Sequence, residues 1–371
     1  MKDSPRILHV STPKSWRGGE QQLAYLFEQL QGKGIHQHII CASGSEMEQK
    51  CKTEKWSFSA VPVKSSLDFS FAKKLRNLCL EQKVDIVHTH DSKGHTFAVL
   101  AATFYRNQAS IVVSRRVDFP VSGSPLSKWK YNHKKVTRIV CVSDTIKKIT
   151  GQSIRDKSKL VTVHSGVNMA RFEEVKDTRP LEKEFNLDPN KPIIGNVAAL
   201  APHKDYPTFI ATAQELVRLG VDAQFVIVGD GPLHNQIHQL VKESGIADKI
   251  TFTGFRKDVL EVLSNFDIFL ITSETEGLGT SILDAFGCKV PVVATRAGGI
   301  PEIVIHTKTG LSASVKDSQS LAVEVVRYLR DETLRKQMVR NASEHLQEFT
   351  VEATAQKTLK VYSEVLTESR L

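Results

Sequence analysis

One stretch of the sequence carries the residue types that binding of a phosphorylated sugar requires. Residues 273–287 read SETEGLGTSILDAFG and follow an apolar run at 268–271 that is typical of a buried strand. A strand that turns through glycines into a helix points several N–H groups at one spot, where the helix dipole favours a phosphate. Glu276 and Asp284 flank the turn and could accept hydrogen bonds from sugar hydroxyls. A diphosphate together with hydroxyls describes a nucleotide-sugar.

The same stretch also has a purely structural interpretation. Ser281 and Asp284 stand three positions apart and could form a capping box at an ordinary strand-to-helix connection. The two interpretations are evenly matched on this stretch alone, and other segments decide between them.

The composition narrows the class of protein. A chain of 371 residues fits two domains, and 40% hydrophobic with 25% charged residues is typical of soluble globular proteins. No apolar stretch approaches the roughly 20 residues that span a bilayer, and residues 1–6 lead into a strand without a signal-peptide apolar region. The five cysteines show no CxxC spacing. We therefore expect a protein of the reducing cytoplasm.

Charge is spread unevenly along the chain. Residues 1–160 hold 27 Lys and Arg against 13 Asp and Glu, a net charge of +14. Residues 161–371 hold 23 against 28, a net charge of −5. The basic half could face nucleic acid, an anionic membrane or an acidic acceptor.

Short apolar runs alternate with helical patterns throughout, which predicts parallel, doubly wound α/β sheets. The runs are continuous and rich in Val and Ile, as in strands covered on both faces. The polar stretch at 171–191 predicts a boundary between two such domains. The expected strands are residues 7–10, 38–41, 86–88, 111–113, 139–142 and 160–163 in the first half, and 193–197, 225–228, 250–252, 268–271 and 290–294 in the second.

Suggestive polar groups follow these strands, at the sheet edge where open parallel sheets bind ligands. Gly18 and Gly19 follow the first strand, and Lys204 follows the run at 193–200. Gly231 follows residues 225–228, and a glycine pair at 298–299 follows residues 290–294. Two sheets that present such loops to one another would enclose a ligand in a cleft between the domains.

In order and spacing these motifs resemble the retaining glycosyltransferases of family 4, which have the GT-B fold of two Rossmann-like doubly wound domains facing across a cleft. The match runs through nearly the whole chain. It consists of Gly18-Gly19, residues 164–168 (HSGVN), Lys204, residues 229–232 (GDGP), the acidic pair Glu276 and Asp284 of a Glu-x7-Glu motif, and residues 298–302 (GGIPE).

The resemblance implies a division of the chain and a set of roles. Residues 1–168 would form an acceptor-side domain, residues 169–349 would bind the nucleotide-sugar, and a C-terminal helix at about 350–371 would pack back on the first domain. Lys204 and the turn would stabilise the leaving diphosphate, while Glu276 would hold donor-sugar hydroxyls and Asp284 the ribose. The remaining substrate-binding residues would be Gly18, Gly19, His90, Gly231, Gly277, Leu278, Gly279 and Thr280.

Three positions depart from the family pattern. Asp284 replaces a glutamate and is one methylene shorter. Residues 198–200 (AAL) lack an arginine that often precedes the phosphate-binding lysine. Residues 114–118 (SRRVD) lack a histidine that often lies near the reacting sugar, so Arg116 could supply a second phosphate-facing cation or contact the acceptor. The chain contains no DxD, so we expect neither metal nor cofactor.

The expected function is transfer of a hexosyl group from a nucleoside-diphosphate sugar to an acceptor hydroxyl with retention, in surface polysaccharide, lipopolysaccharide or glycolipid synthesis. Partners would be the donor and a carbohydrate or lipid-linked acceptor, not nucleic acid. An anionic membrane at the inner face is a further candidate partner of the run Lys128, Trp129, Lys130, Tyr131, Lys134, Lys135 and Arg138, although such a run is more often a solvated helix face. Similarly, His88 and His90 share a face at strand spacing but are more often structural.

Two alternatives stay open. One is a nucleotide-sugar epimerase of the same architecture, and the other is a binding-only member without turnover. A dinucleotide oxidoreductase is disfavoured because no G-x-G-x-x-G opens the first helix.

Overall fold

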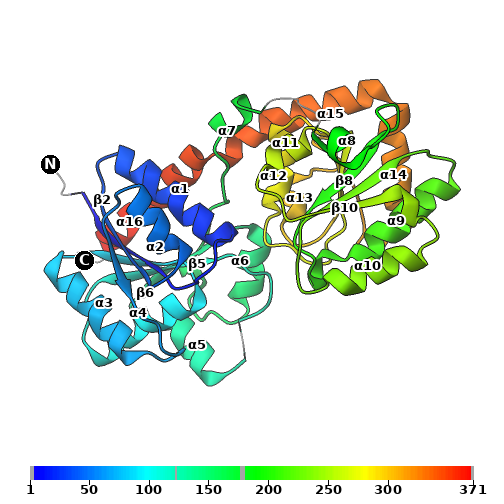
Figure 1. Ribbon diagram of the computed structural model, residues 1–371. Helices are drawn as coiled ribbons and strands as arrows, with labels where there is room; N and C mark the ends of the chain where they lie inside the picture. The colour runs from blue at the N-terminus through cyan, green and yellow to red at the C-terminus, as the bar shows by residue number, and fades with distance from the viewer. Residues whose placement is uncertain (1–3, 122, 176–179, 369–371) are drawn as a thin grey trace. The chain divides into compact units, whose positions relative to one another are not determined.

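Two parallel β-sheets, built from different parts of the chain, organise the protein. The structure is a computed structural model that describes residues 4–121, 123–175 and 180–368 (Figure 1). It divides into two units: Val167–Thr350 forms the second, and the chain up to Gly166 together with the segment from Val351 forms the first. None of the described helices has the length and apolar character needed to cross a bilayer.

The first unit contains a seven-stranded sheet in the order β3-β2-β1-β4-β5-β6-β7, with every pair parallel. Its strands are β1 (Arg6–Ser11), β2 (His36–Ala42), β3 (Phe58–Val61), β4 (Ile86–Thr89), β5 (Ser110–Arg115), β6 (Val136–Cys141) and β7 (Leu160–Thr162). Its helices are α1 (Gly18–Gly32), α2 (Glu46–Thr53), α3 (Phe69–Glu81), α4 (Ser92–Phe104), α5 (Pro125–Tyr131), α6 (Asp144–Gly151) and α16 (Val351–Glu368).

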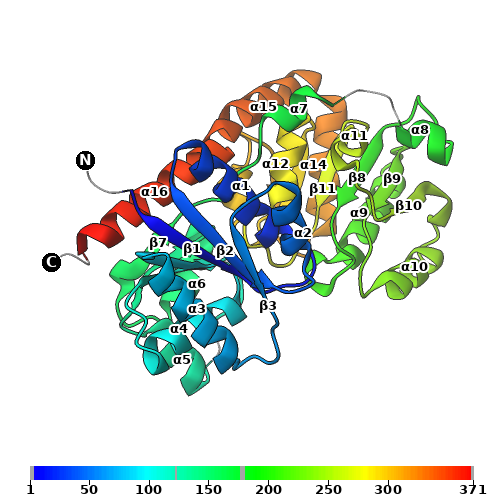
Figure 2. The same ribbon diagram turned by 60° about the vertical axis from the view of Figure 1, so that its left-hand side comes forward.

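The C-terminal helix α16 belongs to the first unit although it follows the second in sequence. Tyr362 and Val365 join a buried cluster with Ile7, Leu26 and Ile86. Figures 1 and 2 both show α16 beside α1. Burial of this apolar stripe holds α16 within the first unit.

The second unit contains a six-stranded parallel sheet in the order β10-β9-β8-β11-β12-β13. Its strands are β8 (Ile193–Val197), β9 (Gln224–Val228), β10 (Ile250–Gly254), β11 (Ile268–Ile271), β12 (Val292–Thr295) and β13 (Leu311–Ala313). Its helices are α7 (Ala170–Glu173), α8 (Pro180–Phe185), α9 (Tyr206–Arg218), α10 (His234–Glu243), α11 (Val259–Leu263), α12 (Thr280–Gly287), α13 (Ile300–Ile303), α14 (Ser318–Arg330) and α15 (Glu332–His345).

Each sheet has a point where the strand order reverses, and such a point leaves a crevice at the carboxyl ends of two neighbouring strands. In the first unit the reversal lies between β1 and β4, and in the second between β8 and β11. The predicted fold class, two doubly wound parallel α/β sheets, is confirmed. All eleven expected strands form, with ends shifted by a few residues, and two more were missed, β3 and β13.

Candidate functional site

Lys204 lies in the second unit, in the loop after β8, and a short chain of contacts fixes the backbone around it. Residues Pro202–Lys204 form a 3-10 turn that ends at Asp205, whose φ is 48°. The Asp205 carboxylate accepts hydrogen bonds from the N–H and hydroxyl of Thr208 and so caps α9. Thr272, which follows β11, donates its hydroxyl to the carbonyl oxygens of Lys204 and Asp205. The loops on both sides of the strand reversal are therefore tied together.

Glu276 comes from the other side of this reversal, after β11, and its carboxylate meets the Lys204 ammonium. The Nζ–Oε2 distance is 2.5 Å, and each side chain is 15% exposed. The hydroxyl of Ser273 donates to the same oxygen at 3.3 Å. A cation and a carboxylate thus stand together at the crevice, both within reach of solvent, where they could contact a phosphate and sugar hydroxyls.

The turn after Glu276 presents backbone donors, as the sequence predicts. Gly279 has a φ of 91° and precedes α12, which begins at Thr280. None of the described residues accepts a hydrogen bond from the N–H groups of Gly277, Leu278, Gly279 or Thr280. Four unpaired N–H groups near a helix N-terminus are suited to an anion.

Three other glycines of this unit are required by close packing of loops. A Cβ on Gly231 would lie 2.6 Å from the Leu200 carbonyl oxygen, and one on Gly229 would lie 2.0 Å from that of Ala198. A Cβ on Gly298 would lie 1.9 Å from the Glu276 carbonyl oxygen, and Gly299 donates its N–H to the same oxygen. The Gly-Gly segment after β12 therefore holds the backbone of Glu276 in place.

Asp284 does not form the capping box that was the structural alternative. It lies in α12 with Arg171 Nη1 3.8 Å from its Oδ1, and no described residue donates a hydrogen bond to that oxygen. The N-cap is Gly279, and it makes no side-chain cap. Burial raises the pKa of Asp284 to about 6, and Arg171 partly opposes the shift. A buried acceptor without a donor is suited to a ligand hydroxyl.

The first unit has a pocket of about 540 Å³ at its own strand reversal. Residues that line it include Gly19, Glu20, His90, Asp91, Arg115 and Arg116. The Asp91 carboxylate is occupied, because it accepts the N–H and hydroxyl of Thr12 and two N–H groups of α4. Glu20 is also engaged, since it accepts the N–H of Arg17 at the start of α1.

Arg116 is a cation of this pocket with few partners. Its Nη1 donates to Ser165 Oγ at 3.5 Å, and its Nε is buried without a partner among the described residues. Burial lowers the pKa of Arg116 to about 10, with Glu20 opposing the shift, so the group stays charged at neutral pH. A desolvated guanidinium with spare donors favours an anion.

The glycine pair of the first unit is not explained by packing. A Cβ on Gly18 would meet no heavy atom within 4 Å, and one on Gly19 would meet only Arg116 Cδ, at 3.9 Å. These residues form the first turn of α1, so an added side chain there would point into open space that a ligand could use.

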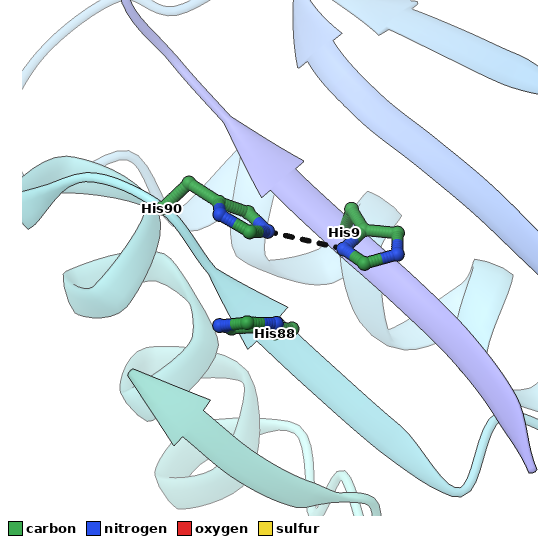
Figure 3. A group of neighbouring side chains, drawn as sticks. All are labelled: His9, His88 and His90. Carbon is green, nitrogen blue, oxygen red and sulfur yellow. Dashed lines mark hydrogen bonds between the residues drawn. The ribbon is translucent and has the colours of Figure 1, made fainter. Parts of the chain in front are cut away.

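His90 reaches the pocket as part of a buried group of three histidines (Figure 3). His9 from β1 and His88 from β4 complete the group, which could in principle hold a metal ion. His9 was not among the predicted site residues, although a histidine inside the apolar strand at residues 7–10 was a usable signal. Arg171 was not predicted either, because it lies 113 positions from Asp284 and spacing gives no signal for the contact.

The basic run at residues 128–138 is not one solvated face. Lys130 is 8% exposed and donates to Ser92 and Thr96, and Tyr131 is 5% exposed. Arg138 pairs with Glu364 and Glu368 of α16. Only Lys128, Trp129 and Lys134 of the run are exposed.

Comparison with known proteins shows the family and the fold of the chain. The family model for glycosyltransferase family 4 matches residues 16–171, and the model for glycosyl transferases group 1 matches residues 177–345. The Bacillus anthracis N-acetyl-alpha-D-glucosaminyl L-malate synthase is 28% identical over 309 residues, covering 82% of this chain and 81% of its own. A Campylobacter jejuni N-acetylgalactosaminyltransferase that acts on N,N'-diacetylbacillosaminyl-diphospho-undecaprenol is 27% identical and covers 80% and 81%.

Solved structures show the same fold. HepE from Anabaena in complex with UDP superposes with a TM-score of 0.84 at 18% identity, covering 97% of this chain and all of its own. A glycosyltransferase from Rickettsia africae gives 0.85 at 22% identity, covering 98% and 99%. The two sheets therefore define a GT-B protein. The chain belongs to the glycosyltransferases of family 4, a family of retaining enzymes.

Proposed function

We propose that the protein transfers a hexosyl group from a nucleoside-diphosphate sugar to an acceptor hydroxyl with retention and without a metal ion. The observation that carries this proposal is the convergence of Lys204, Glu276 and four unpaired N–H groups at one strand reversal. An ammonium and a helix N-terminus meet the charge of a diphosphate, and the adjacent carboxylate binds the hydroxyls of the attached sugar.

Each predicted site residue then takes a role that its surroundings support. Lys204 and the amides of Gly277, Leu278, Gly279 and Thr280 would stabilise the leaving diphosphate. Glu276 would bind donor-sugar hydroxyls and share Lys204 with the phosphate, while Asp284 would bind the ribose. Gly231 would keep the neighbouring loop close enough to contact the nucleotide.

The proposed reaction breaks the bond between the anomeric carbon and the diphosphate oxygen, and the acceptor oxygen bonds to the same face of that carbon. Negative charge grows on the departing phosphate, so fixed positive groups lower the barrier most. The leaving phosphate oxygen would take the acceptor proton. This route needs no protein general base on the acceptor side.

The pocket of the first unit would bind the acceptor, through Gly18, Gly19, His90 and Arg116. Arg116 favours an acceptor that carries an anionic group, such as a carboxylate or a diphosphate. The Bacillus anthracis and Campylobacter jejuni relatives, by their names, use L-malate and a diphospho-undecaprenol glycan. We favour a lipid-linked acceptor in glycolipid or surface polysaccharide synthesis. The enzyme would then act in the cytoplasm, at the inner face of the membrane.

A uridine diphosphate donor is the first to test, because Anabaena HepE has been solved with UDP-glucose. The experiment is a screen of UDP-, GDP- and ADP-sugars by thermal shift and donor hydrolysis. One nucleotide class should raise the melting temperature and be turned over slowly by water. Conversion of the donor to an isomeric nucleotide-sugar would instead identify an epimerase, and binding without turnover with any acceptor would identify a binding-only protein.

A further inference from the structure

The three histidines of the first unit form a hydrogen-bonded chain whose donors and acceptors can be assigned in order. His9, His88 and His90 are 0%, 2% and 6% exposed. Figure 3 shows His9 on β1 and His90 just after β4, with Nδ1 of His9 joined to Nε2 of His90. That distance is 3.0 Å.

The chain of hydrogen bonds begins at the Phe27 carbonyl, a group that can only accept a hydrogen bond. Gln37 Nε2 donates to the backbone carbonyl of Phe27 at 3.0 Å. Because a carbonyl has no hydrogen to give, the Gln37 amide nitrogen must face it, and Gln37 Oε1 must face His9 Nε2, 3.1 Å away. His9 therefore carries its proton on Nε2.

The remaining protons follow from charge. Burial lowers the pKa of His9 to about 4 and lowers the pKa of His90 well below its usual value, with the neighbouring histidines and Arg116 adding to the shift at His90. Both rings are therefore neutral at pH 7. Neutral His9 with a proton on Nε2 has a bare Nδ1, so His90 must donate Nε2–H to it. His90 is left with a bare Nδ1.

That nitrogen is an acceptor without a donor. His90 Nδ1 is buried and has no hydrogen-bond partner among the described residues, while the ring lines the pocket of the first unit. The atom points away from His9 in Figure 3. A buried acceptor left unpaired costs free energy, which a ligand O–H or N–H would recover.

A metal ion accounts for the three rings less well. Both nitrogens of His88 already have partners, Tyr362 Oη at 2.6 Å and Ser114 Oγ at 2.9 Å. The rings of His88 and His90 are tilted by 38° to one another, with centroids 4.2 Å apart. Gln37 also occupies the second nitrogen of His9.

We propose that Gln37 and His9 are positioning residues that fix the tautomer of His90, so that its Nδ1 accepts a hydrogen bond from a sugar hydroxyl or acetamido N–H of the substrate. This rests on the proposed glycosyltransferase function and adds a specificity to it: at this spot the pocket selects a neutral hydrogen-bond donor and disfavours an anion. Gln37 touches no substrate and acts only through His9.

The test begins without any substrate. Nitrogen NMR of histidine-labelled protein distinguishes bare from protonated ring nitrogens, and wild type should show His90 with a bare Nδ1. Gln37→Leu removes the acceptor that fixes His9, so His90 should become a mixture of both tautomers. His38→Asn is the matched control, because His38 is the next residue on β2 and also loses two side-chain hydrogen bonds, to Ser57 and Ser59.

A proton on His90 Nδ1 in wild type, or an unchanged tautomer in Gln37→Leu, would overturn the proposal. The ligand part is tested with free monosaccharides as acceptor probes, added together with UDP-glucose, and the His90 Nδ1 resonance should move on saturation. Gln37→Leu should lower kcat/KM for transfer to the acceptor roughly fivefold to tenfold for the loss of one hydrogen bond. A saturated complex that leaves the resonance unmoved would refute that part. The tautomer result stands apart from donor binding, so failure of the proposed function would be recognised separately.

Discussion

The strand reversals of the two units have the same topology but different chemistry. In the second unit the crevice holds an ion pair, Lys204 with Glu276, beside unpaired N–H groups. In the first unit it holds neutral histidines beside a partly buried arginine. A parallel sheet therefore fixes where a ligand binds, and the loop residues decide which chemical groups it can carry.

The glycines of the two units differ in the same way. Gly298 and Gly231 are needed because another backbone lies within 3 Å of where a Cβ would be, whereas Gly18 has open space around it. Glycine in the second unit serves packing of the site, and glycine at the start of α1 leaves room for a ligand. This difference separates stability effects from binding effects in the variants below.

The largest effect should come from Glu276→Gln. Loss of the carboxylate removes both the Lys204 partner and the proposed sugar contact, so transfer should fall roughly 100-fold or more. The matched control is Glu274→Gln, two residues earlier, whose carboxylate pairs with Lys316 at the surface. Near wild-type turnover in folded Glu276→Gln would show that Glu276 is not an active-site residue.

Two glycine variants sharpen the comparison directly. Gly298→Ala should lower the free energy of unfolding by about 2–4 kcal/mol, because its φ is 51° and the new Cβ would overlap the Glu276 carbonyl. Gly18→Ala should keep or slightly raise the melting temperature and instead weaken substrate binding. Thermal unfolding and KM measured on both proteins test this. If Gly18→Ala lowered the melting temperature and Gly298→Ala changed only KM, the roles assigned to the two glycines would be wrong.

Much of this account was predictable from the sequence. Continuous Val and Ile runs marked eleven strands, because strands buried on both faces need apolar side chains throughout. Strands β3 and β13 lacked that signal: β3 is half-buried along its length, and β13 is only three residues long. The positions of Lys204 and Glu276 after strands also predicted that they lie at one edge of the sheet, since parallel strands bring their carboxyl ends to one edge.

The rest could not be read from spacing. The contact of Arg171 with Asp284 depends on α7 packing on α12, where the ring of Phe172 fills the space beside Gly287. The partners that bury Lys130 and Tyr131 come from another helix, α4, so a run of basic residues was mistaken for a solvated face. The tautomer of His90 depends on Gln37 of β2 and Phe27 of α1, which become neighbours only in the folded protein.

Asp284 gives a pH-dependent prediction. Its pKa is about 6 when folded against a usual 3.8, so the folded protein binds more protons between these values and stability falls as pH rises from about 4 to about 6. Asp284→Asn should therefore be more stable than wild type at pH 7, by about 1–2 kcal/mol after allowing for partial exposure, and equal to it below pH 4. Donor affinity should fall at the same time.

Thermal unfolding of both proteins from pH 4 to pH 8 measures this difference, and donor titration at pH 7 measures affinity. If Asp284→Asn is less stable than wild type at pH 7, the Arg171 contact outweighs desolvation. If donor affinity is unchanged, Asp284 does not bind the ribose. Asp284→Glu, which restores the family's residue, should keep donor binding.

The smallest effect concerns membranes. With Lys130, Tyr131 and Arg138 engaged inside the first unit, the exposed residues of α5 are Pro125, Leu126, Lys128 and Trp129. Binding to anionic vesicles should be weak and salt-sensitive, with about 1 kcal/mol at most per cation, and Trp129→Ala should reduce it severalfold. Co-sedimentation at low and high salt tests this, and equal binding to neutral and anionic vesicles would contradict it.

The central claim is that Lys204 and the N–H groups before α12 meet the charge of the diphosphate without a metal. The most direct measurement is turnover of the nucleotide-sugar in EDTA after exhaustive metal removal, with Lys204→Met and Lys249→Met compared in parallel. The account predicts wild-type and Lys249→Met rates within about twofold of those with metal, and strong loss only in Lys204→Met. Complete loss of wild-type turnover in EDTA, restored by Mg²⁺ or Mn²⁺, would contradict it.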